Sequence, residues 1–177
     1  MNQVEKAGAD VFDLPVPLFD EMMAINARGG FSPAEAYAIH RERLQARGER
    51  IDPNVRMRIE RGSRITPADY AEMVEARQRL VRAMDVLMAD VDALMLPTTA
   101  ICAPKFTEVS TTEGFSQKNM MLLRNPALVN FFDLCAISLP IPGTIDQVGL
   151  MLAARNGHDR KLFSIATAVE QLFAAQS

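Results

Sequence analysis

The second half of the sequence contains the three residue types of a serine hydrolase triad: Ser138, His158 and Asp133. In such a triad the histidine takes the proton of the serine hydroxyl and the aspartate orients the histidine. The serine has to lie on a sharp, exposed turn, as in the pattern Gly-x-Ser-x-Gly. Ser138 instead stands within the apolar run Cys135-Ala136-Ile137-Ser138-Leu139, which is typical of a strand. The sequence therefore argues against a triad of this kind.

Sulfur and imidazole ligands for a metal are few and scattered. The chain has two cysteines, Cys102 and Cys135, and two histidines, His40 and His158. A structural zinc site uses four such ligands in close pairs, and a disulfide framework needs more cysteines. We therefore expect no metal and no cofactor. Both cysteines are expected to be reduced, buried thiols, because each lies in an apolar stretch.

Four arginines, Arg56, Arg58, Arg61 and Arg64, form a basic cluster that could contact a phosphate or an RNA. Such clusters are more often the solvated face of a helix, and Glu60 lowers the local charge. The net charge of −3 gives the chain as a whole no attraction for nucleic acid. Nucleic acid is therefore not an expected partner, while a phosphate contact at the cluster stays open.

Length and composition fit one compact globular domain. The 177 residues are 49% apolar and 23% charged, which is an ordinary balance for such a domain. No apolar run approaches the roughly 18–20 residues of a membrane span. The amino terminus lacks the basic-then-apolar order of a signal peptide. The sequence predicts a cytoplasmic protein with no membrane partner.

Charge divides the chain near residue 91. Residues 1–91 hold 28 charged side chains, whereas residues 92–177 hold 13. The first part therefore predicts surface helices, whose starts are marked by a capping side chain followed by proline. These starts are Ser32-Pro33, Asp52-Pro53 and Thr66-Pro67. Apolar residues at three- and four-residue steps predict the longest helix from Pro67 to Ala89.

The second part has the pattern of strands joined by helices. Three strands are expected over 91–96, 135–139 and 148–153, and two helices over 117–132 and 159–173. Because the apolar runs do not alternate with polar residues, the strands are expected to be covered on both faces. The expected fold class is α/β: a mainly helical flank over 1–91, followed by a mixed sheet with flanking helices over 92–177.

Four stretches of the second part form an ordered set of motifs. They are Val91-Asp92-Ala93-Leu94-Met95-Leu96-Pro97-Thr98-Thr99, Asn130-Phe131-Phe132-Asp133-Leu134-Cys135-Ala136-Ile137-Ser138-Leu139-Pro140, Gly149-Leu150-Met151-Leu152 and Asp159-Arg160-Lys161-Leu162. The helical stretch that begins at Asp52-Pro53 precedes them in the same order. Together they resemble the carboxy-terminal part of the amidase-signature family of serine amidases.

The resemblance implies an α/β/α enzyme fold, of which residues 1–177 would be a single partial domain. Members of the family hydrolyse carboxylic amides with a Lys–cis-Ser–Ser triad, beside glycine-rich backbone N–H groups that stabilise the oxyanion. The chain contains no Gly-Gly-Ser-Ser-Gly-Gly run, and none of its lysines lies in a matching context. The expectation is therefore that it has no catalytic residues and no amidase activity by itself.

The same resemblance suggests two residues of a substrate pocket. In the family, loops after the Pro-Thr strand and near the late asparagine help to form the acyl side of the pocket, which points to Thr98 and Asn130. The structural alternative is that Thr98 ends a strand and Asn130 caps backbone groups. Both interpretations stay open, with positions at strand ends favouring function.

Three interpretations of function follow. The first is the carboxy-terminal region of an amidase that acts on a small-molecule amide in the intact enzyme. The second is a non-catalytic binding or scaffold module, and the third is part of a transfer-RNA amidotransferase A-type subunit. The stretch 130–136 resembles general amidases and allophanate- or biuret-type hydrolases more than that subunit. Open strand edges predict a partner, either the missing amino-terminal amidase half or a second copy, over about 1,000 Å² or more.

Overall fold

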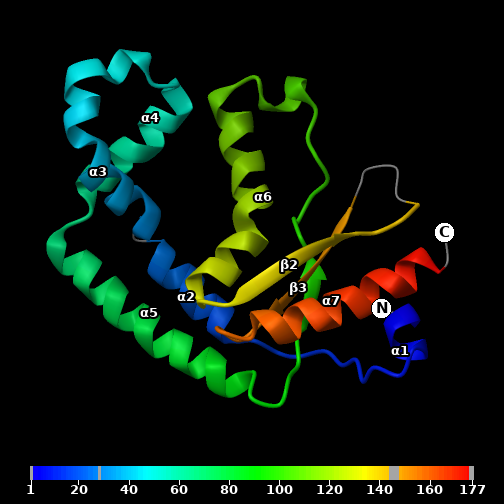
Figure 1. Cartoon of the computed structure of the whole chain (residues 1–177). Coiled ribbons are helices and arrows are strands. Elements are labelled where there is room, and N and C mark those ends of the chain that lie inside the picture. The colour runs from blue at the N-terminus through cyan, green and yellow to red at the C-terminus, as the bar shows by residue number, and fades with distance from the viewer. Residues whose placement is uncertain (1, 28, 144–147, 176–177) are drawn as a thin grey trace. The chain divides into compact units, whose positions relative to one another are not determined.

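A computed structural model describes residues 2–27, 29–143 and 148–175 (Figure 1). Its elements in chain order are α1 (Asn2–Lys6), α2 (Leu18–Asn26), α3 (Phe31–Arg47), η1 (Gly48–Arg50), α4 (Pro53–Glu60), η2 (Arg61–Arg64), α5 (Pro67–Leu87), β1 (Leu94–Pro97), η3 (Phe106–Val109), α6 (Thr112–Phe131), β2 (Cys135–Pro140), β3 (Gly149–Ala154) and α7 (Asp159–Ala174), where η marks a 3-10 helix. The chain forms two compact units, Met1–Val16 with Ala83–Ser177 and Pro17–Arg82. The single partial domain expected over 1–177, divided at residue 91, stays a prediction.

The sheet of the larger unit has its strands in the order β1-β3-β2, and both pairs are antiparallel. The α/β class is confirmed, while the sheet differs from the mixed one expected. The connection between β2 and β3 covers only residues 141–148, and parallel neighbours need a crossover of a dozen or more. Strands β1 and β2 do run parallel to each other and are joined through α6, but β3 lies between them.

Helices α7 and α6 pack on opposite faces of this sheet. The buried residues on the α7 side are Leu139, Leu152, Ala154, Leu162, Ala166 and Val169. Those on the α6 side are Val129, Met151 and Ala153, with Leu94, Leu96 and Leu134 partly buried. Successive residues of β3 therefore face different helices, as the two-residue period of a strand requires.

Only β3 is closely covered on both faces among these strands. Residues 151–154 are buried, whereas β2 exposes Ala136, Ser138 and Pro140 on the side that faces α6. The expectation that every strand is covered on both faces is therefore wrong for β2. The reason is that the apolar core on the α6 side includes residues of β1 and β3 but none of β2.

In the smaller unit, two helices start where the sequence indicates. The carboxylate of Asp52 accepts hydrogen bonds from the N–H groups of Asn54 and Val55 at 2.9 and 3.2 Å. At the start of α5, the Thr66 hydroxyl accepts from the Asp69 N–H, and the Asp69 carboxylate accepts from the Thr66 N–H. These contacts satisfy N–H groups that have no partner within the first helical turn.

The start of α3 departs from the expectation. Ser32 does not cap this helix, which begins at Phe31 after Gly30. Gly30 has a φ of 77°, a conformation that glycine adopts without the steric cost of a Cβ. The backbone of Gly30 therefore sets the entry into α3 two positions earlier than a Ser32 cap would.

The long helix α5 follows its predicted apolar stripe. Met73, Leu80, Met84 and Met88 are at most 1% exposed, and their helical spacing keeps them on one face. The helix ends at Leu87, two residues before the predicted end at Ala89.

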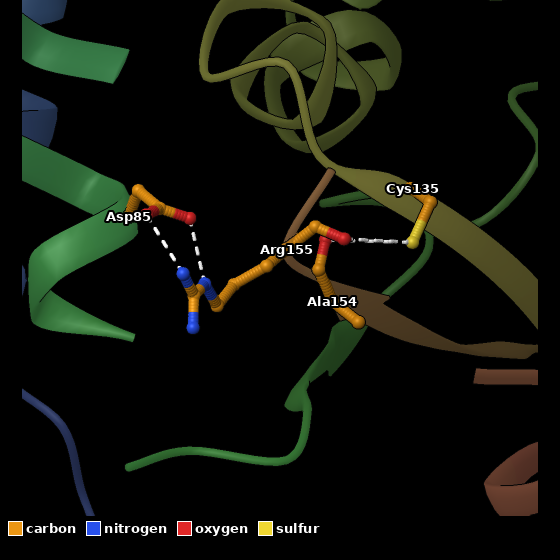
Figure 2. A network of polar contacts seen from close by, with 4 residues as sticks. All are labelled: Asp85, Cys135, Ala154 and Arg155. Atoms are coloured by element: carbon orange, nitrogen blue, oxygen red, sulfur yellow. Dashed lines mark hydrogen bonds and ion pairs between the residues drawn. The ribbon is translucent and has the colours of Figure 1, made fainter. Parts of the chain in front are cut away.

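A bidentate ion pair joins the end of β3 to α5 within the larger unit (Figure 2). Arg155 Nε and Nη2 lie 2.6 and 2.8 Å from Asp85 Oδ1 and Oδ2. The planar guanidinium matches both carboxylate oxygens at once. Hydrogen bonding to Arg155 lowers the pKa of Asp85 below its ordinary value.

We expect this pair to make stability depend on pH in the acid range. Because the folded-state pKa of Asp85 is lowered, its contribution is present above the unfolded-state pKa of about 4 and is lost as the pH falls through the folded-state pKa. The Tm of the wild type should exceed that of Asp85→Asn at neutral pH, and the difference should shrink in acid. Asp90→Asn, which removes another exposed carboxylate, is the matched control. A wild-type advantage that does not change between neutral pH and about pH 3 would contradict the expectation.

Candidate functional site

The sheet face toward α6 carries a pair of hydroxyl groups. Thr98 Oγ1 and Ser138 Oγ lie 2.5 Å apart, in a hydrogen bond that either group can donate. Thr98 directly follows β1, and its N–H donates to the carbonyl oxygen of Gly149 at 2.9 Å. Ser138 lies in β2, opposite Met151 of β3. The pair therefore links the two edge strands over the beginning of the central strand.

Gly149 leaves the space in which the two hydroxyls meet. A Cβ at this position would lie 2.6 Å from both Ser138 Oγ and Thr98 Oγ1. Any side chain at the start of β3 would thus push the hydroxyls apart. A glycine inside a strand often marks such a close approach.

Asn125 of α6 anchors the strand end beside this pair. Its side chain is 5% exposed, and Nδ2 donates to the carbonyl oxygen of Pro97 at 2.7 Å. Because Pro97 precedes Thr98, the bond fixes the backbone that positions the Thr98 hydroxyl. Sequence reasoning missed Asn125. The available signal was its helical spacing from the apolar Val129, which places a polar side chain on the buried face.

The two residues expected in a substrate pocket have different surroundings. Thr98 is half-buried and bonded to Ser138, whereas Asn130 is exposed on α6. Helical spacing places Asn130 on the same side of α6 as Met120 and Leu123, which are 66% and 43% exposed. A pocket role for both residues stays a prediction.

In the described part of the chain, the hydrogen bonds of this hydroxyl pair include none to a basic side chain. Two lysines of the larger unit face carboxylates: Lys118 Nζ lies 2.8 Å from Glu108 Oε1, and Lys161 Nζ lies 2.5 Å from Asp92 Oδ1. The hydrogen bond with Lys118 lowers the pKa of Glu108. A serine nucleophile needs an adjacent base to take its proton. This arrangement can bind a polar ligand group, but it supplies no base.

The expectation for the cysteines is wrong for Cys102. This residue is exposed because it lies in the loop after β1 rather than in a strand. Cys135 is half-buried, and its thiol lies 3.3 Å from the carbonyl oxygen of Arg155, to which it donates (Figure 2). Burial raises the pKa of Cys135, which favours the protonated thiol over the thiolate.

Residues 2–27, 29–143 and 148–175 contain neither a cluster of metal ligands nor a helix that could span a membrane. No group of three or more His, Cys, Asp or Glu side chains there is placed to hold a metal ion. No helix within the same residues is both long and apolar enough to cross a membrane.

Comparison with known proteins identifies the family. The family model described as Amidase matches residues 1–163, and the chain therefore belongs to the amidase family. It is 30% identical over 174 residues to 2-amino-5-chloromuconic acid deaminase from Comamonas testosteroni, and 25% identical over 158 residues to an amidase from Pseudomonas putida. These alignments cover 97% and 89% of this chain, but only 38% and 34% of the relatives. The chain thus spans little more than a third of the length of these curated relatives.

Two solved structures have a similar fold. A crystal structure of an amidase matches with a TM-score of 0.75 at 23% identity, covering 99% of this chain and 39% of the other. Allophanate hydrolase from Kluyveromyces lactis matches with a TM-score of 0.77 at 22% identity, covering 97% and 28%. These likenesses establish the fold. The amidase resemblance is confirmed, and the partial coverage agrees with its assignment to the carboxy-terminal region.

We expect Gly149→Ala to destabilise the chain, because the added Cβ enters the space of the two hydroxyls. Overpacking of this kind costs about 1–3 kcal/mol. The cost should fall when Ser138→Ala removes one of the oxygens, with a coupling of about 1 kcal/mol. The coupling energy is measured by urea denaturation of the wild type, both single variants and the double variant. Ser164→Ala, on α7, is the control and should add independently. Additive effects of Gly149→Ala and Ser138→Ala would show that the hydroxyl pair does not need the glycine.

Proposed function

We propose that the chain is the carboxy-terminal region of an enzyme that hydrolyses the C–N bond of a small-molecule carboxylic amide. Membership of the amidase family supports this assignment. So does the coverage of only 34–38% of the curated relatives. The order of the four late motifs supports the carboxy-terminal position. The Lys–cis-Ser–Ser triad would then belong to amidase sequence outside these 177 residues.

Within that enzyme, the chain contributes to the substrate pocket and leaves the bond-breaking step to the other part. The observation that carries this proposal is the Thr98–Ser138 pair, whose hydroxyls bond to each other at 2.5 Å. One hydroxyl proton of the pair stays available to a ligand, together with oxygen lone pairs. These groups suit the carbonyl and N–H of an amide. With Asn130, they form the proposed polar wall on the acyl side.

Uncovered apolar surface in the larger unit supports a partner. Phe106 is 93% exposed, and Met120 and Leu123 of α6 are also exposed. Strands β1 and β2 are both edge strands. Open edges and apolar patches are normally covered in soluble proteins. We propose that the amino-terminal amidase region covers this surface, and that a second copy of the chain does so in its absence.

Complementation tests the division of labour. The chain alone should release no amine from a simple aryl amide, because no base activates its serines. Co-expression with the part of the Comamonas testosteroni relative that this chain does not match should give an active pair, while neither polypeptide acts alone. Release of the aryl amine is the measurement.

The same assay separates the other interpretations. Turnover by the chain alone, lost on Ser138→Ala or on changing one of its lysines, would overturn the proposal. A stable but inactive pair would favour a non-catalytic module. Activity that requires charged transfer RNA would favour the amidotransferase subunit. The proposed location is the cytoplasm, which the two free cysteines support.

Self-association of the isolated chain is a separate expectation. Sedimentation velocity at micromolar concentrations should show a dimer. Met120→Glu should weaken it by about tenfold or more, because an unpaired carboxylate is costly to bury. Val86→Glu, at an apolar residue of α5 that is 76% exposed against 66% for Met120, is the control and should leave the dimer intact. A compact monomer at every concentration would contradict this expectation.

A further inference from the structure

The smaller unit contains a hollow of about 690 Å³. Residues of helices α3 and α4, both labelled in Figure 1, and of the turn η2 line it. The charged residues of this wall are Arg41, Arg56, Glu60, Arg61 and Arg64. Its volume lies within the range of small-molecule binding sites, about 300–1,000 Å³. A concave site with four guanidinium groups is a candidate for an anionic ligand.

Among the described residues, carboxylates neutralise only a small part of this positive charge. Arg56 Nε lies 2.7 Å from Glu60 Oε1, so one arginine of the wall is paired. The side-chain contact of Arg61 is with a sulfur, at 3.9 Å, which is a weak acceptor. Among the described residues, Arg41, Arg61 and Arg64 face no carboxylate within ion-pair distance. The hollow therefore concentrates three free guanidinium groups.

Close packing fixes the turn that carries two of these groups. A Cβ at Gly62 would lie 2.0 Å from the carbonyl oxygen of Pro33 and 2.8 Å from Tyr37 Cβ. Gly62 therefore lets η2 approach the backbone of α3 directly. Arg61 and Arg64, on either side of this contact, extend from a backbone that is already positioned. Such preorganisation lowers the entropic cost of binding.

We propose that this hollow binds a small molecule that carries two or more phosphate groups. The planar fork of arginine matches phosphate oxygens with two parallel hydrogen bonds. A phosphate monoester carries about −1.5 to −2 charges at neutral pH, so two such groups carry about −3 to −4 and offset the three free guanidinium groups. A single carboxylate would leave two arginines unmatched. A wall drawn from three elements favours a compact ligand over an extended strand of RNA. This site goes beyond the proposed amide hydrolysis.

Isothermal titration calorimetry of the full chain with inorganic tripolyphosphate tests the proposal. Arg64→Gln and Arg41→Gln should each weaken binding by about tenfold or more, since each removes charge-assisted hydrogen bonds. Arg58→Gln is the matched control, because Arg58 lies on α4 outside the wall and the variant loses the same charge. Its Kd should change by less than about twofold. Circular dichroism confirms that each variant is folded.

Several results would overturn the proposal. Absence of binding at millimolar tripolyphosphate would do so, as would an equal loss in Arg58→Gln, which would show that only the overall surface charge matters. Equal binding of citrate, with the same dependence on Arg64, would remove the preference for phosphate. Tighter binding of a single-stranded RNA that displaces tripolyphosphate would assign the surface to nucleic acid. Because amide hydrolysis is not measured, these outcomes leave the proposed function to its own test.

Discussion

Strand β3 is the constraint on which the larger unit depends, because it alone among the three described strands is hydrogen-bonded along both edges. Strands β1 and β2 are separated in the chain by α6, and neither pairs with the other. Met151 and Leu152 of β3 face different helices, so this one strand also contributes to both apolar cores. A shift of its register by one residue would exchange those faces. It would also separate Thr98 from Ser138, whose meeting point is over Gly149.

The Thr98–Ser138 hydroxyl pair is suited to binding a ligand but not to nucleophilic attack. Two hydroxyls bonded to each other use one proton internally, which leaves one proton and several lone pairs for a ligand. These donor and acceptor groups suit recognition of an amide, which presents both an N–H donor and a carbonyl acceptor. Nucleophilic attack makes a different demand, since the attacking oxygen has to lose its proton to a neighbour. In the described part of the chain, lysines such as Lys118 and Lys161 face carboxylates instead.

Features set by a few neighbouring residues were predictable, and features set by distant contacts were not. The helix starts at Asp52 and Thr66 depend on groups three residues away, so their capping patterns were visible in the sequence. The α/β class followed from apolar runs that end at prolines. The antiparallel pairing was not visible, because it depends on which strand enters between β1 and β2. Asn125 was missed for a similar reason: its partner is the carbonyl oxygen of Pro97, 28 positions earlier.

The distribution of charge around the arginine hollow also depends on residues that are distant in the sequence, so it could not be predicted. The sequence places Arg56 and Arg58 in one cluster, yet the fold puts Arg56 in the wall of the hollow with Arg58 outside it, and brings Arg41 from another helix. A count of the charged residues in the sequence also does not reveal that Glu60 neutralises only one of these arginines. The net charge of −3 does not cancel the attraction of the hollow, because salt screens charges beyond roughly 8–10 Å. An anion that reaches this wall therefore responds to the three free guanidinium groups around it, and hardly to the carboxylates elsewhere on the chain.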